Sequence, residues 1–189
     1  SQLIADERAG KFNGQTVQLV PHLTGAIKDA IAFAAEGSDI HIVEVGGTVG
    51  DYEGLSFVEA IRDFANRVGR ENCLYVHVVY VPFIQTSKEF KSKPAQNALN
   101  DLRGFGIVPD CVVVRTDDPA PGDIAAKIAR FSGVAEDAVI LLSNANTVYE
   151  VPLTIYASGI GPVLERFTGN TKVPDLSKWR NLAEAQETR

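Results

Sequence analysis

Residues 73–82 read CLYVHVVYVP, residues 109–116 read PDCVVVRT, and residues 137–143 read DAVILLS. In these three segments Val, Ile and Leu follow one another almost without interruption, instead of alternating with polar residues. Such runs are typical of strands that are covered on both faces. The three segments therefore predict buried strands of a mainly parallel sheet.

Two further strands and four helices are expected around these segments. The other predicted strands are QTVQLV (15–20) and DIHIVEV (39–45), and the predicted helices cover 24–36, 56–69, 94–103 and 122–132. Ser56 and Glu59 have the spacing of a capping box, and Pro94 suits a first helical turn. The stretch DLSKWRNLAEAQE predicts a closing helix. Strand and helix alternate, which predicts a three-layer α/β fold with a mainly parallel sheet.

Size and charge narrow the class of protein. A chain of 189 residues suits one domain, here residues 1–189, and no linker marks a second one. The net charge of −6 argues against nucleic acid as the main partner, and no apolar run is long enough to cross a membrane. Cys73 and Cys111 lie in apolar runs, which favours reduced core cysteines of a cytoplasmic protein.

Polar clusters follow the predicted strands. They are EVGGTVGDYEG, FIQTSKEFKSK, RTDDPAPGD and SNANTVYE. In open parallel sheets, ligands bind outside the carboxyl ends of the strands. We therefore expect the functional residues in these four clusters.

Glu44 is the only acid inside the run IHIVEVGG. A carboxylate at a strand end either binds a hard cation such as Mg²⁺ or makes a structural pair, and the residues alone leave both open. Asp51 and Glu53 come after the glycines, where a solvated loop before a helix would explain them equally well.

The segment KSKPAQ (91–96) places two lysines before a proline that begins a helix, close to Lys88. Point charges and free backbone N–H groups at a helix start suit a triphosphate, although a solvated basic loop is the alternative. Lys127 by itself is an amphipathic-helix lysine. We interpret His22, His41 and His77 as structural. No GxxxxGK[ST] phosphate loop occurs in the sequence.

Together, the segments EVGGTVGDYE, KSKPAQ and NTVYEVPL resemble the synthetase domain of the CTP synthase family, over essentially the whole chain. The resemblance implies a P-loop NTPase-like, dethiobiotin synthetase-like amidoligase fold. It also implies that ATP and Mg²⁺ serve to phosphorylate the 4-oxygen of UTP. Ammonia, released from glutamine by a glutaminase domain, then displaces the phosphate to give CTP. A homotetramer is implied as well.

The resemblance implies roles for individual residues. Glu44 matches a Mg²⁺ ligand, and no residue of this chain matches a catalytic one. The residues that match the UTP or CTP site are Asp51, Tyr52, Glu53, Lys91, Ser92, Lys93, Pro94, Ala95, Gln96 and Lys127. The residues that match the loop beside the adenine of ATP are Ser143, Asn144 and Ala145.

The sequence departs from the family pattern in two ways. Single residues differ: Ser92 and Ala95 replace threonines, Asn97 a histidine, Ser56 a proline, and Asn144 and Asn146 aspartates. Ala95 puts one phosphate hydrogen bond in doubt. The P-loop segment and the glutaminase domain of the family are also missing, so we expect them outside this chain and expect the chain alone to be inactive.

Three hypotheses follow. The chain supplies the UTP/CTP and Mg²⁺ part of a CTP synthase ligase site, or it is a truncated, non-catalytic nucleotide-binding or assembly module. The third, another amidoligase such as a dethiobiotin or cobyrinate synthetase, is disfavoured by KSKPAQ and EVGGTVGDYE.

Overall fold

The computed structural model describes residues 2–187, which form two compact units. The first unit comprises the described part of Ser1–Cys73 together with Gly104–Ile107, and the second comprises Leu74–Arg103 with the described part of Val108–Arg189. The expectation of one domain over residues 1–189 stays a prediction.

The first unit is built from helices. Its elements are α1 (Gln2–Arg8), a π-helical turn (Leu19–Leu23), α2 (Thr24–Ala34), a 3₁₀ turn (Tyr52–Gly54), α3 (Leu55–Val68) and a second 3₁₀ turn (Arg70–Asn72). Helices α2 and α3 pack against each other and are joined by ion pairs of Lys28 with Asp63 and of Arg67 with Asp29. The predicted helices at 24–36 and 56–69 are confirmed.

The predicted strands at 15–20 and 39–45 are wrong. Neither segment forms a strand in the described residues, and Ile42 is 87% exposed. A β-strand requires hydrogen bonds to a neighbouring strand, and the first unit contains no strand that could supply them in its described part. An apolar pattern alone is therefore insufficient to form a strand in these two segments.

The predicted capping box at the start of α3 is also wrong. The helix begins at Leu55, after Gly54, without a side-chain hydrogen bond to its first turn. Ser56 is buried inside the helix, and Glu59 forms an ion pair with Arg62. Helix α3 therefore starts from the preceding 3₁₀ turn, which already sets the helical direction of the chain.

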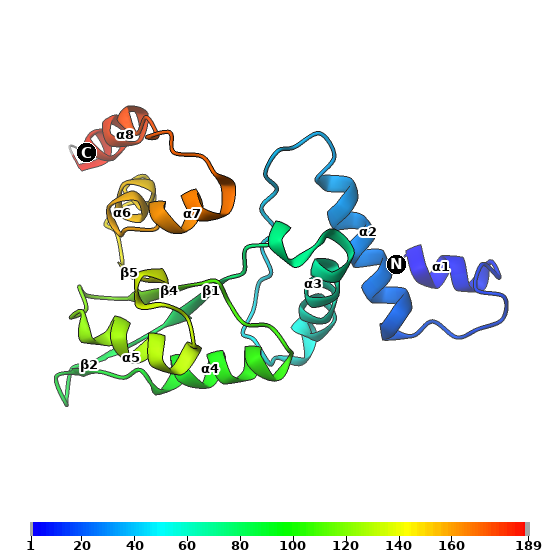
Figure 1. Ribbon diagram of the computed structural model, residues 1–189. Helices are drawn as coiled ribbons and strands as arrows, with labels where there is room; N and C mark the ends of the chain where they lie inside the picture. Colours follow the sequence, from blue (N-terminus) through cyan, green and yellow to red (C-terminus); the bar gives the residue numbers. More distant parts are fainter. Residues whose placement is uncertain (1, 188–189) are drawn as a thin grey trace. The chain divides into compact units, whose positions relative to one another are not determined.

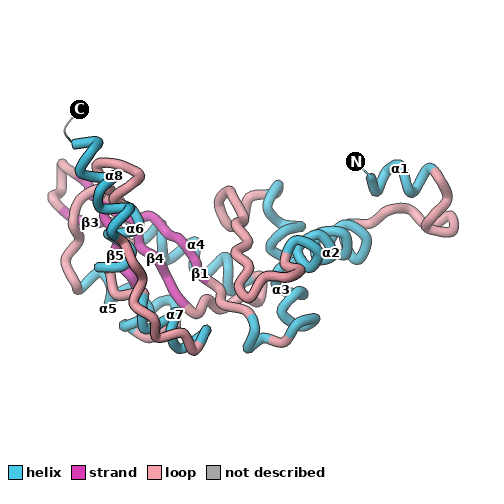
Figure 2. Tube along the Cα trace, turned by 90° about the horizontal axis from the view of Figure 1, so that it is seen from above, coloured by secondary structure: helices cyan, strands magenta, loops and turns pink. Residues whose placement is uncertain are grey.

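The second unit contains a parallel sheet. Its strands are β1 (Val76–Tyr80), β4 (Cys111–Thr116) and β5 (Val139–Ser143), in the order β1-β4-β5 (Figure 2). A separate antiparallel hairpin joins β2 (Phe83–Ile84) to β3 (Glu89–Phe90). The α/β class and the parallel sheet are confirmed, and all three strands are shorter than the runs that predicted them. The prediction that each strand is buried on both faces is wrong for β1, because Val76, Val78 and Tyr80 are exposed.

Helices lie on both sides of this sheet. Figure 1 shows α4 (Lys93–Gly104) and α5 (Asp123–Ser132) on one side, and α6 (Val151–Ala157) and α7 (Gly161–Thr168) on the other. A 3₁₀ turn (Glu136–Ala138) precedes β5, and α8 (Ser177–Glu187) is the predicted closing helix. The core contains β4 and faces of α4 and α5, and its members include Val112, Val114, Leu99, Ile124 and Ile128.

The structure tests the predicted positions of the two cysteines and of His41. Cys111 is buried in β4, where burial and then nearby Asp110 raise the pKa of its thiol to about 11. Cys73 is only half-buried and lies outside the strands, so its assignment to a core strand was wrong. The interpretation of His41 as a strand residue was wrong too, because His41 is exposed in an irregular segment.

No helix in the described part of the chain could span a membrane.

Candidate functional site

The carboxyl ends of the three parallel strands meet at one edge of the second unit. Tyr80 pairs in register with Arg115, and Thr116 pairs with Ser143. The polar segments RTDDPAPGD and SNANTVYE begin at this edge, and FIQTSKEFKSK follows shortly after β1. Three of the four predicted clusters therefore leave one sheet edge. The fourth, EVGGTVGDYEG, follows no strand.

A hydrogen-bonded network joins the ends of all three strands. The Asn144 side chain donates to Asp117 (Nδ2 to Oδ1, 3.0 Å) and accepts from Arg115 (3.0 Å to Oδ1). Asp117 also accepts the Tyr80 hydroxyl, and this bond is the main reason that the pKa of Tyr80 lies above its usual value. The backbone N–H of Asn144 donates to Thr116 O (2.9 Å). Asn144, which directly follows β5, is therefore held in place by hydrogen bonds to the end of β4.

Sequence reasoning missed Arg115, Asp117 and Tyr80. One signal was available, because Arg115 is the only charged residue within β4. A charged side chain at the end of an otherwise apolar strand is costly unless it is solvated or paired. Here it reaches the polar edge and pairs with Asn144.

The hairpin before α4 positions the lysine-rich segment. Phe83 and Phe90 pair across the hairpin with ring centroids 4.9 Å apart, and the Lys91 backbone N–H donates to Pro82 O (2.9 Å). Lys88 turns the chain with a left-handed φ of 54° and donates its N–H to Ile84 O (2.8 Å). The backbone of Lys91, which directly follows β3, is consequently held in a fixed position.

Residues 91–96 divide into exposed and buried positions. Lys91, Lys93 and Pro94 are exposed, while Ser92, Ala95 and Gln96 are only 5%, 1% and 6% exposed. The Gln96 side chain donates to Ser92 Oγ (3.0 Å). Pro94 is the second residue of α4, as predicted for a first turn. The lysines thus face solvent, while the buried residues anchor the helix start.

Glu89 interacts with two residues that the sequence predicts to bind a nucleotide, Lys91 and Lys127. Its carboxylate pairs with Lys91, which is the main cause of its lowered pKa, and a hydrogen bond with Ser87 contributes next. The positive charge of Lys127, an exposed residue of α5, lowers this pKa further. Lys91 therefore pairs with this carboxylate directly, whereas Lys127 acts on it only through its charge. Sequence reasoning also missed Glu89.

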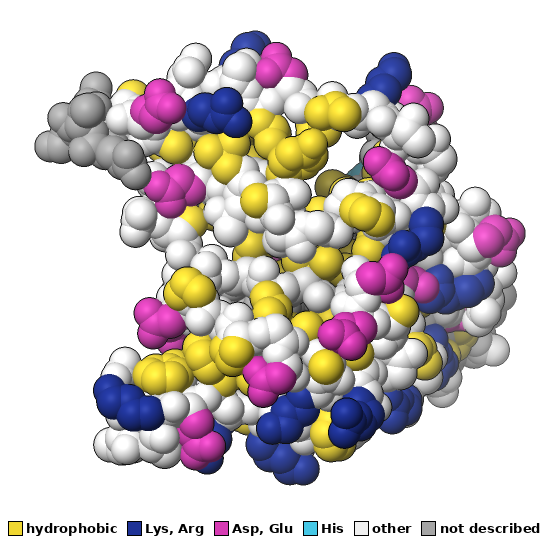
Figure 3. All heavy atoms as spheres, turned by 60° about the vertical axis from the view of Figure 1, so that its left-hand side comes forward, with side chains coloured by type: hydrophobic (Ala, Val, Ile, Leu, Met, Phe, Trp, Pro, Cys, Tyr) yellow, Lys and Arg dark blue, Asp and Glu magenta, His cyan; other side chains and the backbone are white. Residues whose placement is uncertain are grey.

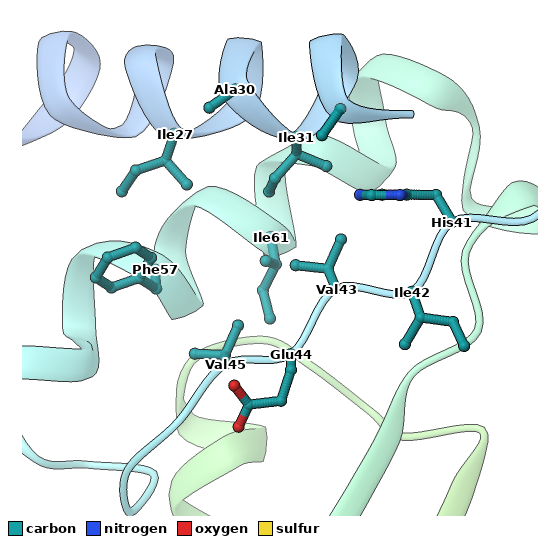
Figure 4. Close-up of a pocket in the computed structure, with 11 residues that line it drawn as sticks. Ile27, Ala30, Ile31, His41, Ile42, Val43, Glu44, Val45, Phe57 and Ile61 are labelled. Atoms are coloured by element: carbon teal, nitrogen blue, oxygen red, sulfur yellow. The ribbon is translucent and has the colours of Figure 1, made fainter. Parts of the chain in front are cut away.

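The first unit contains an apolar pocket that includes Glu44 in its lining but not Asp51, Tyr52 or Glu53. Figure 4 shows an apolar pocket between α2, α3 and residues 41–45, with Val43 and Val45 directed toward the helices. Glu44 and Ile42 point to the opposite side (Figure 4). Side-chain directions thus alternate as in a strand, although no strand ladder forms. The pocket is lined mainly by aliphatic side chains, such as Ile27, Ile31 and Ile61.

The acids of the first unit are open to solvent. Glu44 is exposed and makes no hydrogen bond or ion pair with another described residue. Asp51 precedes the 3₁₀ turn Tyr52–Gly54 and accepts the Gly54 N–H with its backbone oxygen (3.0 Å). Tyr52 is 87% exposed, and Glu53 is exposed.

No group of three or more His, Cys, Asp or Glu side chains that could hold a metal occurs among residues 2–187. Mg²⁺, however, is commonly bound by one or two carboxylates together with phosphate oxygens and water. The single free carboxylate of Glu44 fits that kind of site, in which the ligand supplies most of the oxygens.

Comparison with known proteins identifies the family. The family described as CTP synthase N-terminus matches residues 1–168. Proteins named CTP synthase from Thermomicrobium roseum and Methanococcus maripaludis are 47% and 44% identical over 187 and 183 residues, which is 97% and 96% of this chain. A CTP synthase from Geobacter sulfurreducens is 46% identical over 183 residues. The chain spans 34% of the length of each of these relatives. The protein therefore belongs to the CTP synthase family.

Proposed function

We propose that this chain contributes the pyrimidine-nucleotide and Mg²⁺ part of a ligase site that converts UTP to CTP with ATP and ammonia. The relatives are named for this product. The observation that carries the proposal is the placement of two exposed lysines, Lys91 and Lys93, between the hairpin that follows β1 and the start of α4, at the carboxyl edge of a parallel sheet. Cations at such an edge suit a phosphate-rich ligand.

In this proposal, the triphosphate of UTP or CTP binds at the start of α4. Lys91 and Lys93 are exposed there, and the first turn of a helix has free backbone N–H groups that favour an anion. The first turn of α4 contains Pro94, and its buried residues anchor the helix start in the protein interior. These buried residues are Ser92, Ala95 and Gln96. Lys127 contributes charge from α5.

Asp51, Tyr52 and Glu53 are proposed to contact the pyrimidine nucleotide. They are exposed, and carboxylates suit the polar groups of base and sugar better than phosphate. Glu44 would hold Mg²⁺ through its free carboxylate. When bound, the ion neutralises charge that builds up on phosphate oxygens during phosphoryl transfer.

Ser143, Asn144 and Ala145 are proposed to lie beside the adenine of ATP. The fixed geometry of Asn144, which is bonded to Arg115 and Asp117, supports a rigid contact surface. A P-loop NTPase-like fold, a homotetramer, a cytoplasmic location and a glutaminase partner domain remain further predictions of this proposal.

The test is calorimetric titration of the chain with CTP and UTP in the presence of Mg²⁺. We expect binding that Lys91→Ala and Lys93→Ala each weaken by about 10- to 150-fold, because a hydrogen bond to a charged group contributes about 1.5–3 kcal/mol. Lys172→Ala is the matched control, since Lys172 is an exposed lysine far along the chain. Equal affinity in all variants would remove the triphosphate role.

A second measurement separates the enzyme fragment from an intact enzyme. We expect no ATP-dependent CTP formation from UTP and ammonia by this chain alone, because its sequence has no GxxxxGK[ST] phosphate loop. Robust turnover would contradict this proposal.

A further inference from the structure

We propose that Glu89 is an internal counter-anion of the lysine cluster, which a phosphate-bearing ligand must displace and which thereby selects for highly charged phosphates. The inference rests on the proposed triphosphate site but goes beyond it. It concerns a residue that itself binds no phosphate, and it predicts that removing a charge strengthens binding.

The position of Glu89 is built into the fold. Glu89 begins β3 and pairs in register with Ile84 of β2, next to the packed rings of Phe83 and Phe90. Because Lys91 is also held by its backbone bond to Pro82, the Glu89–Lys91 pair joins two fixed backbone positions. The hairpin therefore keeps the two residues within reach of each other.

The charges around Glu89 define what it neutralises. Lys91 contacts it directly and Ser87 donates a hydrogen bond, while the positive charge of Lys127 on α5 acts on it more weakly. Lys93 begins α4 and forms no ion pair with another described residue. One carboxylate thus faces two cations, and the cluster keeps an excess of positive charge that attracts anions.

The pair is open enough to exchange partners. The side chains of Lys91 and Glu89 are 49% and 52% exposed, and exposed ion pairs are weak. Figure 3 shows that Lys and Arg side chains gather along the lower edge of one face of the molecule, with single carboxylates among them. A triphosphate carries several charges and can replace one carboxylate, whereas a monophosphate gains little by doing so.

Calorimetry with sodium triphosphate, CTP and inorganic phosphate tests the inference on the full chain. We expect Glu89→Gln to bind triphosphate and CTP about 3- to 10-fold more tightly and to gain measurable binding of inorganic phosphate. Glu89→Asp keeps the charge and should stay close to the unsubstituted chain. Glu165→Gln removes an exposed charge from α7 and should leave all affinities unchanged.

The outcomes separate this inference from the proposed function. In one outcome, the unsubstituted chain binds CTP and Lys91→Ala weakens this binding, but Glu89→Gln leaves it equal or weaker. The counter-anion role is then overturned, and the triphosphate site stands. If only Glu89→Gln binds triphosphate, the counter-anion role stands and the proposed function of the unsubstituted site falls. If neither chain binds, both are overturned. In the Lys91→Ala background, the effect of Glu89→Gln should largely disappear.

Discussion

Strand β4 and residues 39–45 have similar compositions but different structures. In β4, Cys111, Val112 and Val114 are fully buried between β1 and β5. In the first unit, Ile42 is 87% exposed and Val43 is 44% exposed, in a segment without a ladder. The difference lies in the neighbours, since only β4 has a strand on each side. Apolar sequence becomes a strand when another backbone pairs with it.

The largest expected effect compares one isoleucine from each region. Ile140 of β5 is 3% exposed, so Ile140→Ala should reduce the free energy of unfolding by about 2–5 kcal/mol. Ile42→Ala should change it by no more than about 0.5 kcal/mol, because its side chain is already in water. Urea unfolding measures both, with Trp179 fluorescence as a probe of the second unit and far-UV circular dichroism for the whole chain.

Ile140→Val is the control for packing, and it should cost about 0.5–1.5 kcal/mol. Equal losses for Ile140→Ala and Ile42→Ala would show that residues 39–45 are packed in solution and would break the comparison.

The second comparison concerns polar contacts. Asn144→Ala removes two side-chain hydrogen bonds that link β4 to the end of β5, and it should cost about 1 kcal/mol. Asn66→Ala in α3 removes one contact of 3.5 Å and places a better helix former, so its effect should be near zero. Trp179 fluorescence and circular dichroism during urea unfolding again report the difference. A larger loss for Asn66→Ala would contradict the assignment of the rigid network to the second unit.

The two regions also explain what could be predicted from sequence. The strands containing Val79, Val114 and Ile140 and the helices between them follow from local patterns, because these residues are buried in the core that the strands and helices share. The prediction for residues 39–45 failed because the pattern does not state whether a partner strand is present. At the site, Lys91 could be identified from its sequence context. The pairing of Asp117 with Tyr80 and the approach of Lys127 to Glu89 depend on the fold, so no local pattern reveals them.

The third prediction is a pH dependence that belongs to the second unit. Burial lowers the pKa of His77 below its ordinary value of 6.5, and its Nε2 atom is buried without a hydrogen-bond partner. The unfolded chain therefore binds a proton more readily than the folded chain. Stability should be complete above pH 6.5 and should decrease as the pH falls toward the folded-state pKa.

Urea unfolding followed by Trp179 fluorescence at pH 8, 7, 6 and 5 measures this slope. His77→Phe should remove most of it, whereas His41→Phe, a change at an exposed position of the first unit, should leave it in place. A slope that survives His77→Phe would assign the dependence to other groups.

The smallest expected effect compares one surface ion pair from each unit. The hydrogen bond from Lys28 is the main cause of the lowered pKa of Asp63, and it joins α2 to α3. Asp63→Asn should cost about 0.5 kcal/mol, because exposed ion pairs contribute about 0–1 kcal/mol. This stabilisation should be complete above the unfolded pKa of 3.8 and should be lost as the pH falls through the lower folded-state pKa. Asp137→Asn, which removes the more exposed pair with Arg166, should cost about 0.2 kcal/mol or less. Circular dichroism during urea unfolding at low and high salt measures both. A larger cost for Asp137→Asn would mean that surface charge stabilises the second unit more than the first, although the Arg166–Asp137 pair is the more exposed of the two.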